Sequence, residues 1–172
     1  MDDLLPLTPS RLHLLICPHR AGYRLMNTLA TRLALLGPVC VLDGGNGLDV
    51  HAIARLARQQ HACPEDILQR ITIGRAFTCC QMSRLLSQPC PANLPILVMD
   101  LLATFYDENL PLPERLRLLQ SGLEALRPAT ALLCASPPAP DQPSDLLDTL
   151  VSAVDAVWRW EESVPLDTPR LF

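Results

Sequence analysis

Three short segments of the sequence contain residue types that could bind or transform a phosphate group. The first combines a histidine, two arginines and a glycine with a cysteine and a tyrosine, at Cys17, His19, Arg20, Gly22, Tyr23 and Arg24. Cations beside a glycine at the start of a helix are suited to holding an anion. The other two segments, at Asp43, Gly45 and Asn46 and at Asp100, supply carboxylates, which are the groups that hold Mg²⁺.

The seven cysteines form no C-x-x-C pair, so they match neither a disulfide framework nor a zinc ribbon. We predict reduced thiols, with Cys40 and Cys134 as small core residues because both lie in apolar runs. The alternative is a metal cluster, although the spacing of its candidate ligands matches no standard site. Those candidates are Cys63, Cys79, Cys80, Cys90, His51 and His61.

The composition excludes several function classes. With 172 residues, 49% hydrophobic and 19% charged, the chain has the size and hydrophobicity of one folded domain. All 14 basic residues are arginine, which excludes lysine-dependent catalysis. A net charge of -4 gives no overall attraction to nucleic acid. Prolines interrupt the longest uncharged stretch, 85–99, so no membrane span is expected, and the acidic start Met1-Asp2-Asp3 predicts a cytoplasmic protein without a signal peptide.

Apolar runs of strand length alternate with segments of helical periodicity. Strands are predicted over 12–16, 39–42, 71–73, 96–99, 131–135 and 156–161. Helices are predicted over 23–36, 50–60, a short segment after Pro64, 81–87, 113–126 and 145–154. This alternation indicates an α/β fold, with a mainly parallel sheet covered by helices on both faces, in a single domain over 1–172.

Four motifs carry a resemblance to a known family. They are D-G-G-N-G-L at 43–48 with its following helix, P-E-D-I-L-Q-R-I at 64–71, G-R-A-F at 74–77 and P-I-L-V-M-D at 95–100. In this order and spacing the chain resembles the RecA-like ATPases. Within that family it is similar to the archaeal and eukaryotic recombinases, their paralogues and the clock-protein-like relatives. The resemblance covers nearly the whole chain and implies a RecA-like P-loop fold without the family's separate N-terminal module. The run ending at Asp100 is similar to a Walker B strand.

The phosphate-binding motif of this family is largely missing. A P-loop has the form G-x-x-x-x-G-K-[ST], in which the lysine neutralises phosphate and the hydroxyl holds Mg²⁺. Over 17–24 only Gly22 matches, because Tyr23 falls at the lysine position and Arg24 at the hydroxyl position. The resemblance also places Gly45, beside Asn46, where the recombinases have the glutamate that orients water.

These departures predict a degenerate member that hydrolyses no ATP and needs neither ATP nor Mg²⁺ as a cofactor. Asp100 is then a strand-end hydrogen-bonding residue, with Mg²⁺ binding as the alternative. Asp43 is predicted to hold a turn, with a catalytic acid as the alternative. The cations His19, Arg20 and Arg24 either bind an anion or are solvated or salt-bridged.

Two functions remain in competition. The first is a non-catalytic interaction subunit, as a homo-oligomer or with another RecA-like subunit, in recombination, repair or with a different RecA-family ATPase. The second is an atypical nucleotide hydrolase in which Arg24 or a partner's residue replaces the lysine. The resemblance places DNA-binding loops at 107–111 and 136–144, which contain no arginine, so direct DNA binding is expected to be weak. Helix 113–126 and the strand with Trp158 and Trp160 are the predicted contact regions, and a monomer with these side chains internal is the alternative.

Overall fold

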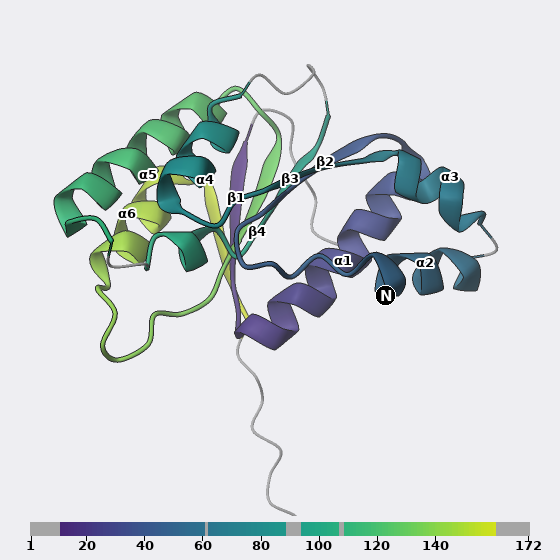
Figure 1. The fold of residues 1–172 in the computed structure, drawn as a ribbon, viewed down its shortest axis with the longest axis horizontal. Coiled ribbons are helices and arrows are strands. Elements are labelled where there is room, and N and C mark those ends of the chain that lie inside the picture. The colour runs from purple at the N-terminus through teal and green to yellow at the C-terminus, as the bar shows by residue number, and fades with distance from the viewer. Residues whose placement is uncertain (1–10, 61, 89–93, 107–108, 161–172) are drawn as a thin grey trace, which may run out of the picture.

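A parallel sheet forms the centre of the molecule (Figure 1). The computed structural model describes residues 11–60, 62–88, 94–106 and 109–160. In these ranges a six-stranded sheet has the order β3-β2-β4-β5-β1-β6, and each neighbouring pair is parallel. The strands are β1 Leu12–Ile16, β2 Val39–Asp43, β3 Ile71–Arg75, β4 Ile96–Met99, β5 Ala131–Ala135 and β6 Ala156–Arg159.

Helices cover both faces of the sheet. One face carries α1 His19–Leu36, α2 Val50–Gln59 and α3 Pro64–Gln69. The other carries α4 Cys79–Leu86, α5 Leu112–Leu126 and α6 Asp145–Ala153, with a short 3₁₀ helix, η1 Leu101–Thr104, after β4. In Figure 1 the two groups lie on opposite sides of the strands. This arrangement confirms the predicted α/β class, with a parallel sheet covered on both faces, as in Rossmann-like and RecA-like folds.

The central strands are mainly apolar because both of their faces are covered, with His13 in β1 and Asp43 at the end of β2 as buried polar residues. In β1, Leu12 and Leu14 pack toward α5 and α6, whereas Leu15 packs toward α1. All five residues of β1, β2 and β5 are buried. Strand β3, at one edge of the described sheet, is different, since Thr72 and Ile73 are exposed.

The element boundaries differ from the predictions where apolar periodicity is a weak guide. Helix α1 begins at His19 instead of Tyr23, directly after Pro18. Its first turn is polar, so hydrophobic spacing could not reveal it. Strand β6 ends at Arg159, and the predicted end of this strand at Glu161 lies outside the described residues.

The leucines of α5 belong to the core. Leu119, Leu123 and Leu126 are buried and Leu116 packs against them, so the prediction that this helix exposes leucines to a partner is wrong. The helix is amphipathic because its leucines cover the sheet. In the described part of the chain no helix has the length and hydrophobicity needed to cross a membrane.

The two edge strands retain exposed apolar side chains. Trp158 of β6 is half-buried and stacks on His13, with ring centroids 4.9 Å apart and an interplanar angle of 7°. Trp160 follows β6 and is 54% exposed. At the opposite edge of the sheet, Ile73 and Phe77 are also exposed.

Candidate functional site

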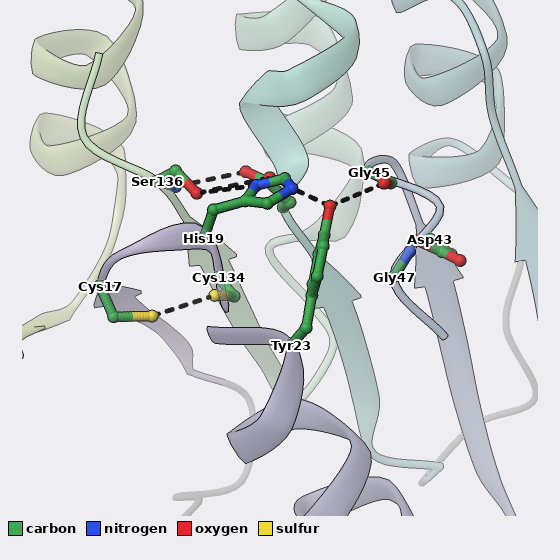
Figure 2. Close-up of polar contacts among 9 residues, drawn as sticks. Cys17, His19, Tyr23, Asp43, Gly45, Gly47, Cys134 and Ser136 are labelled. Atoms are coloured by element: carbon green, nitrogen blue, oxygen red, sulfur yellow. Dashed lines mark hydrogen bonds and ion pairs between the residues drawn. The ribbon is translucent and has the colours of Figure 1, made fainter. Parts of the chain in front are cut away.

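The carboxyl ends of four strands bring three predicted residues and one further residue together at one end of the sheet, where ligands bind in folds of this class. β1 leads to His19, β2 ends at Asp43, β4 is followed by Asp100, and β5 is followed by Ser136. Figure 2 shows His19 and Ser136 close together, with Tyr23 extending from α1 toward Gly45. The site is therefore built from segments far apart in the sequence.

Asp100 is surrounded by hydrogen-bond donors of the protein itself. It is 4% exposed, and its Oδ2 lies 2.6 Å from Nδ1 of His19. Its Oδ1 accepts a bond of 3.3 Å from the backbone N–H of Ser136. The backbone of Asp100 is left-handed, with φ 46° and ψ 59°, a conformation that costs a non-glycine residue on the order of 1 kcal/mol. Contacts from β5 and α1 hold it there.

His19, Asp100 and Ser136 do not form a nucleophilic triad. In a triad the two nitrogens of the imidazole contact the acid and the hydroxyl separately. Here Nδ1 of His19 faces both Asp100, at 2.6 Å, and the Ser136 hydroxyl, at 3.4 Å. The Nδ1–H that donates to the carboxylate cannot also accept the serine proton. The Ser136 hydroxyl also donates toward Oδ2 of Asp100, at 3.4 Å, so the three side chains form one hydrogen-bonded cluster at this end of the sheet.

Tyr23 occupies the space between α1 and the loop after β2. Its hydroxyl donates a 2.6 Å hydrogen bond to the carbonyl of Gly45 and lies 3.4 Å from Oδ2 of Asp100. Burial, together with the charges of Asp100 and Asp43, raises the pKa of this phenol above its ordinary value. The phenol therefore stays protonated and keeps its donor.

Gly45 and Gly47 permit this close approach. A β-carbon at Gly45 would collide with the Tyr23 hydroxyl, and one at Gly47 would collide with the ring. Neither glycine has a positive φ, so close contact with Tyr23, and not backbone conformation, is what requires a glycine at both positions. Between them, Asn46 takes the left-handed conformation with φ 55°, which asparagine tolerates better than most residues.

Asp43, at the end of β2, holds the same loop through its carboxylate. Its two carboxylate oxygens accept hydrogen bonds from the backbone N–H groups of Gly47, at 2.9 Å, and Leu48, at 3.1 Å. Arg75 at the end of β3 lies 3.1 Å from Oδ2. Because Asp43 is fully buried, these partners offset the cost of removing a charge from water. Its oxygens are engaged in holding the loop.

Neither Arg20 nor Arg24 of α1 is bonded to Asp100 in the described structure. Arg20 is exposed in the first turn. Arg24 lines a cavity of about 440 Å³ between α1 and α2, whose wall also includes Tyr23, Asp49 and Arg55. Asp100 is not part of that wall. Of the three cations predicted to hold an anion, His19 is instead paired with Asp100.

The cysteines divide between core and surface. Cys17, Cys40, Cys79 and Cys134 are buried, and Cys63 and Cys80 are exposed. Gly22 lies against the sulfurs of Cys17 and Cys134. Within the described ranges no three His, Cys, Asp or Glu side chains are grouped so as to hold a metal ion. Cys90 and His61 of the alternative metal cluster lie outside those ranges.

Sequence reasoning missed three residues that complete the site. Ser136 follows β5 at the same sheet edge, and its position after a predicted strand was the available signal. Arg75 ends β3 and pairs with Asp43. Asn27 is 5% exposed and ties α1 to the loop, donating to the carbonyls of Tyr23 and Gly47 and accepting from the N–H of Asp49.

No family model matches the chain, and none of the curated proteins searched matches it significantly.

Proposed function

We propose that this chain is a non-hydrolysing RecA-like protein that acts as an interaction subunit. The observation that carries the proposal is the position of Tyr23. Its side chain, at the place where the resemblance puts the phosphate-binding lysine, bonds to Gly45 and packs on Gly47. A nucleotide phosphate would have to displace this ring and break its hydrogen bond.

The surroundings of Asp100 support the same conclusion. A Mg²⁺ ion needs near-octahedral oxygen ligands, and it usually shares them among phosphate, water and one or two protein groups. The Asp100 carboxylate is instead engaged by His19 and Ser136. Arg24, at the position where the resemblance puts the Mg²⁺-binding hydroxyl, has no oxygen that could bind the ion.

The position of Arg24 weighs against the alternative, an ATPase in which this arginine replaces lysine. Arg24 lines the cavity between α1 and α2 together with Arg55, and Asp100 lies outside that lining. A phosphate bound by Arg24 in this cavity would be separated from Asp100 by the Tyr23 side chain. Transfer of a phosphoryl group requires both groups to act on one nucleotide.

The interaction role is supported by the edges of the sheet. Ile73 and Phe77 are exposed at the β3 edge, and Trp160 is exposed beside the β6 edge. Exposed aromatic side chains at a strand edge favour association with a second copy or with another RecA-like subunit. The free thiols of the described residues support a cytoplasmic location for this assembly.

Direct contact with DNA is not part of this role. The segment 136–144 contains no arginine, and neither does 107–111, of which residues 107–108 lie outside the described structure. We expect weak, non-specific DNA binding at physiological salt. Tight binding with a steep salt dependence would contradict this part of the proposal.

The absence of ATP hydrolysis is tested by measuring phosphate release from ATP in the presence of Mg²⁺. The wild-type protein is compared with the Asp100→Ala and Arg24→Ala variants. We expect the same background rate for all three. Mg²⁺-dependent release that disappears in both variants would establish the alternative ATPase.

The interaction half is tested by sedimentation over a concentration series, and by mixing with RecA-like ATPases from the same cell. We expect a complex that Phe77→Ser or Trp160→Ser weakens, whereas Thr72→Ser, a mild exposed change on β3, leaves it intact. A strictly monomeric protein that binds none of these ATPases would contradict the interaction role.

A further inference from the structure

Two cysteines meet beneath the first turn of α1. Cys17 directly follows β1, and Cys134 is in β5, the strand that pairs with β1. Their sulfurs lie 3.6 Å apart, although the two residues are 117 positions apart in the sequence. Figure 2 shows the side chains directed toward one another. Both residues are free thiols, 2% and 3% exposed.

The pairing of β1 with β5 brings the two cysteines to the same end of neighbouring strands. Cys134 is paired with Leu15, and the N–H of Cys17 donates a 3.2 Å bond to the carbonyl of Ala135. These bonds belong to the centre of the sheet, which is the least mobile part of such a fold. Disulfide formation would bring the two sulfurs from 3.6 Å to roughly 2.05 Å.

Gly22 provides the space for the pair. A β-carbon at this position would lie 2.9 Å from Sγ of Cys17 and 3.0 Å from Sγ of Cys134. Gly22 is inside a helix, where glycine costs about 1 kcal/mol relative to alanine, and its φ is not positive. The one glycine that matches the P-loop pattern is thus explained by two sulfur contacts.

The pKa values of the two thiols shift in opposite directions. A hydrogen bond from Cys134 lowers the pKa of Cys17, whereas the same bond and deep burial raise the pKa of Cys134. Cys17 also lies just before the N-terminal end of α1, where the helix dipole favours a thiolate. Cys17 is therefore the nucleophile of the pair, and Cys134 keeps its proton.

A small crevice reaches Cys17 from the surface. It has a volume of about 30 Å³ and is lined by Cys17, Ala21, Leu25 and the exposed Trp160. This volume admits a molecule of the size of water and excludes a bulky disulfide such as oxidised glutathione. Hydrogen peroxide is an oxidant of the permitted size.

We propose that Cys17 and Cys134 form an oxidation site at which hydrogen peroxide converts two thiols into an intramolecular disulfide. The Cys17 thiolate attacks one peroxide oxygen, the O–O bond breaks, and a sulfenic acid forms with release of hydroxide, which becomes water on taking a proton. The Cys134 sulfur then attacks the sulfenic sulfur, its proton leaves with the departing hydroxyl as a second water, and the S–S bond forms. Two electrons pass from the thiols to the peroxide.

The test treats the reduced, folded protein with a small excess of hydrogen peroxide, blocks the remaining thiols, and identifies disulfide-linked peptides by mass spectrometry. A Cys63→Ser, Cys80→Ser, Cys90→Ser background removes the two exposed thiols and the one outside the described residues. We expect a peptide pair joining Cys17 to Cys134, loss of the mass of two hydrogens, and recovery of both thiols on reduction.

Matched variants separate the steps. In Cys134→Ser, oxidation is expected to stop at a sulfenic acid on Cys17 that a dione probe captures, and in Cys17→Ser residue 134 is expected to stay reduced. Cys40→Ser removes a different buried thiol and should leave the disulfide unchanged. Gly22→Ala is expected to slow disulfide formation by about tenfold, because the added methyl displaces the sulfurs.

The proposal is overturned if the folded protein in this background keeps Cys17 and Cys134 reduced while peroxide is consumed, or if Cys17 pairs with another cysteine. The main measurement keeps Cys17 and Cys134 unchanged, so it stays valid if Cys17→Ser, Cys134→Ser or Gly22→Ala fails to fold, and it can be repeated on the wild-type protein if the triple background does. The outcome is also independent of ATP hydrolysis and of partner binding.

Discussion

The ring of Tyr23 lies directly on the backbone of Gly47, so closely that a β-carbon at residue 47 would fall among the ring atoms. Asn27 reinforces this contact by bonding the carbonyls of both residues. The contact joins the first turns of α1 to the loop after β2. It makes Tyr23 a structural residue at a position where the resemblance implies a catalytic one.

Gly47→Ala is therefore expected to lower the free energy of unfolding by about 2 to 3 kcal/mol, because the methyl group overpacks the ring. In a Tyr23→Ala background the same change should have little effect, since the clash is gone. Urea denaturation of the four proteins in this cycle measures the coupling. Gly37→Ala is the control, because a β-carbon there meets no atom within 4 Å. Equal losses in both backgrounds would show that Tyr23 does not make this contact.

Both tyrosines of the chain, Tyr23 and Tyr106, should resist ionisation. Burial and the charge of Asp100 raise the pKa of Tyr106 to about 12, and that of Tyr23 is also raised, mainly by burial. We expect almost no tyrosinate absorbance at a pH of about 10.5, where the unfolded protein is more than half ionised.

Because the folded state holds these protons more tightly, its stability is full below the unfolded pKa of about 10 and falls as the pH rises further. Tyrosinate absorbance is titrated with and without guanidinium. Tyr23→Phe should remove half of the signal of the unfolded protein. A folded protein that ionises one tyrosine normally, near pH 10, would be inconsistent with this burial.

Asp43→Ala is expected to destabilise the fold by about 3 kcal/mol, because it leaves a buried set of N–H donors and the Arg75 guanidinium without their acceptor. Arg75→Ala should cost less, about 1 kcal/mol, since Arg75 is 37% exposed and water can replace it. Asp43→Asn keeps one acceptor oxygen and should fall between the two. The free energies of unfolding are compared at neutral pH. A larger loss for Arg75→Ala than for Asp43→Ala would contradict the conclusion that the loop N–H groups are the main partners of Asp43.

His13 should make the protein less stable in mild acid. Burial lowers the pKa of this imidazole in the folded state, so the unfolded chain binds a proton more readily. Stability is then full above the unfolded pKa of about 6.5 and decreases as the pH falls toward the folded pKa. His13→Phe preserves the stacking on Trp158 and should flatten this pH dependence, whereas the exposed His51→Gln should not. The free energy of unfolding is measured by urea denaturation at several pH values between about 8 and 5. An equal pH dependence in His13→Phe and the wild-type protein would contradict the prediction.

The order of strands and helices could be predicted because their signals are local. Strands β1, β4 and β5 have the predicted bounds, since each is an apolar run ended by polar residues or proline. The 3₁₀ helix at Leu101–Thr104 was not predicted, because it continues the apolar run without a period of its own. The leucines of α5 were expected to be available to a partner, whereas the structure buries them in the core. Composition does not show which leucines the sheet covers.

The site was harder to predict because its contacts are not local. The positions of Asp43 and Asp100 at strand ends followed from the alternation of strands and helices. The bond between Tyr23 and Gly45 depends on the angle at which α1 crosses the β2 loop, which no sequence pattern reports. The meeting of Cys17 with Cys134 depends on the pairing of β1 with β5, a pairing between segments that are more than 100 residues apart.

The place of β1 between β5 and β6 has a consequence during synthesis. During synthesis, β1 finds its hydrogen-bonding partners only after residues 131–135 and 156–159 have been made. Until then β1, which has four leucine or isoleucine residues and one histidine, is unpaired on both edges, and an unpaired, mainly apolar strand favours aggregation. Nascent chains that stop before Ala131 should therefore depend on chaperones, and the synthesis of β5 and β6 should trigger closure of the described sheet in one cooperative step.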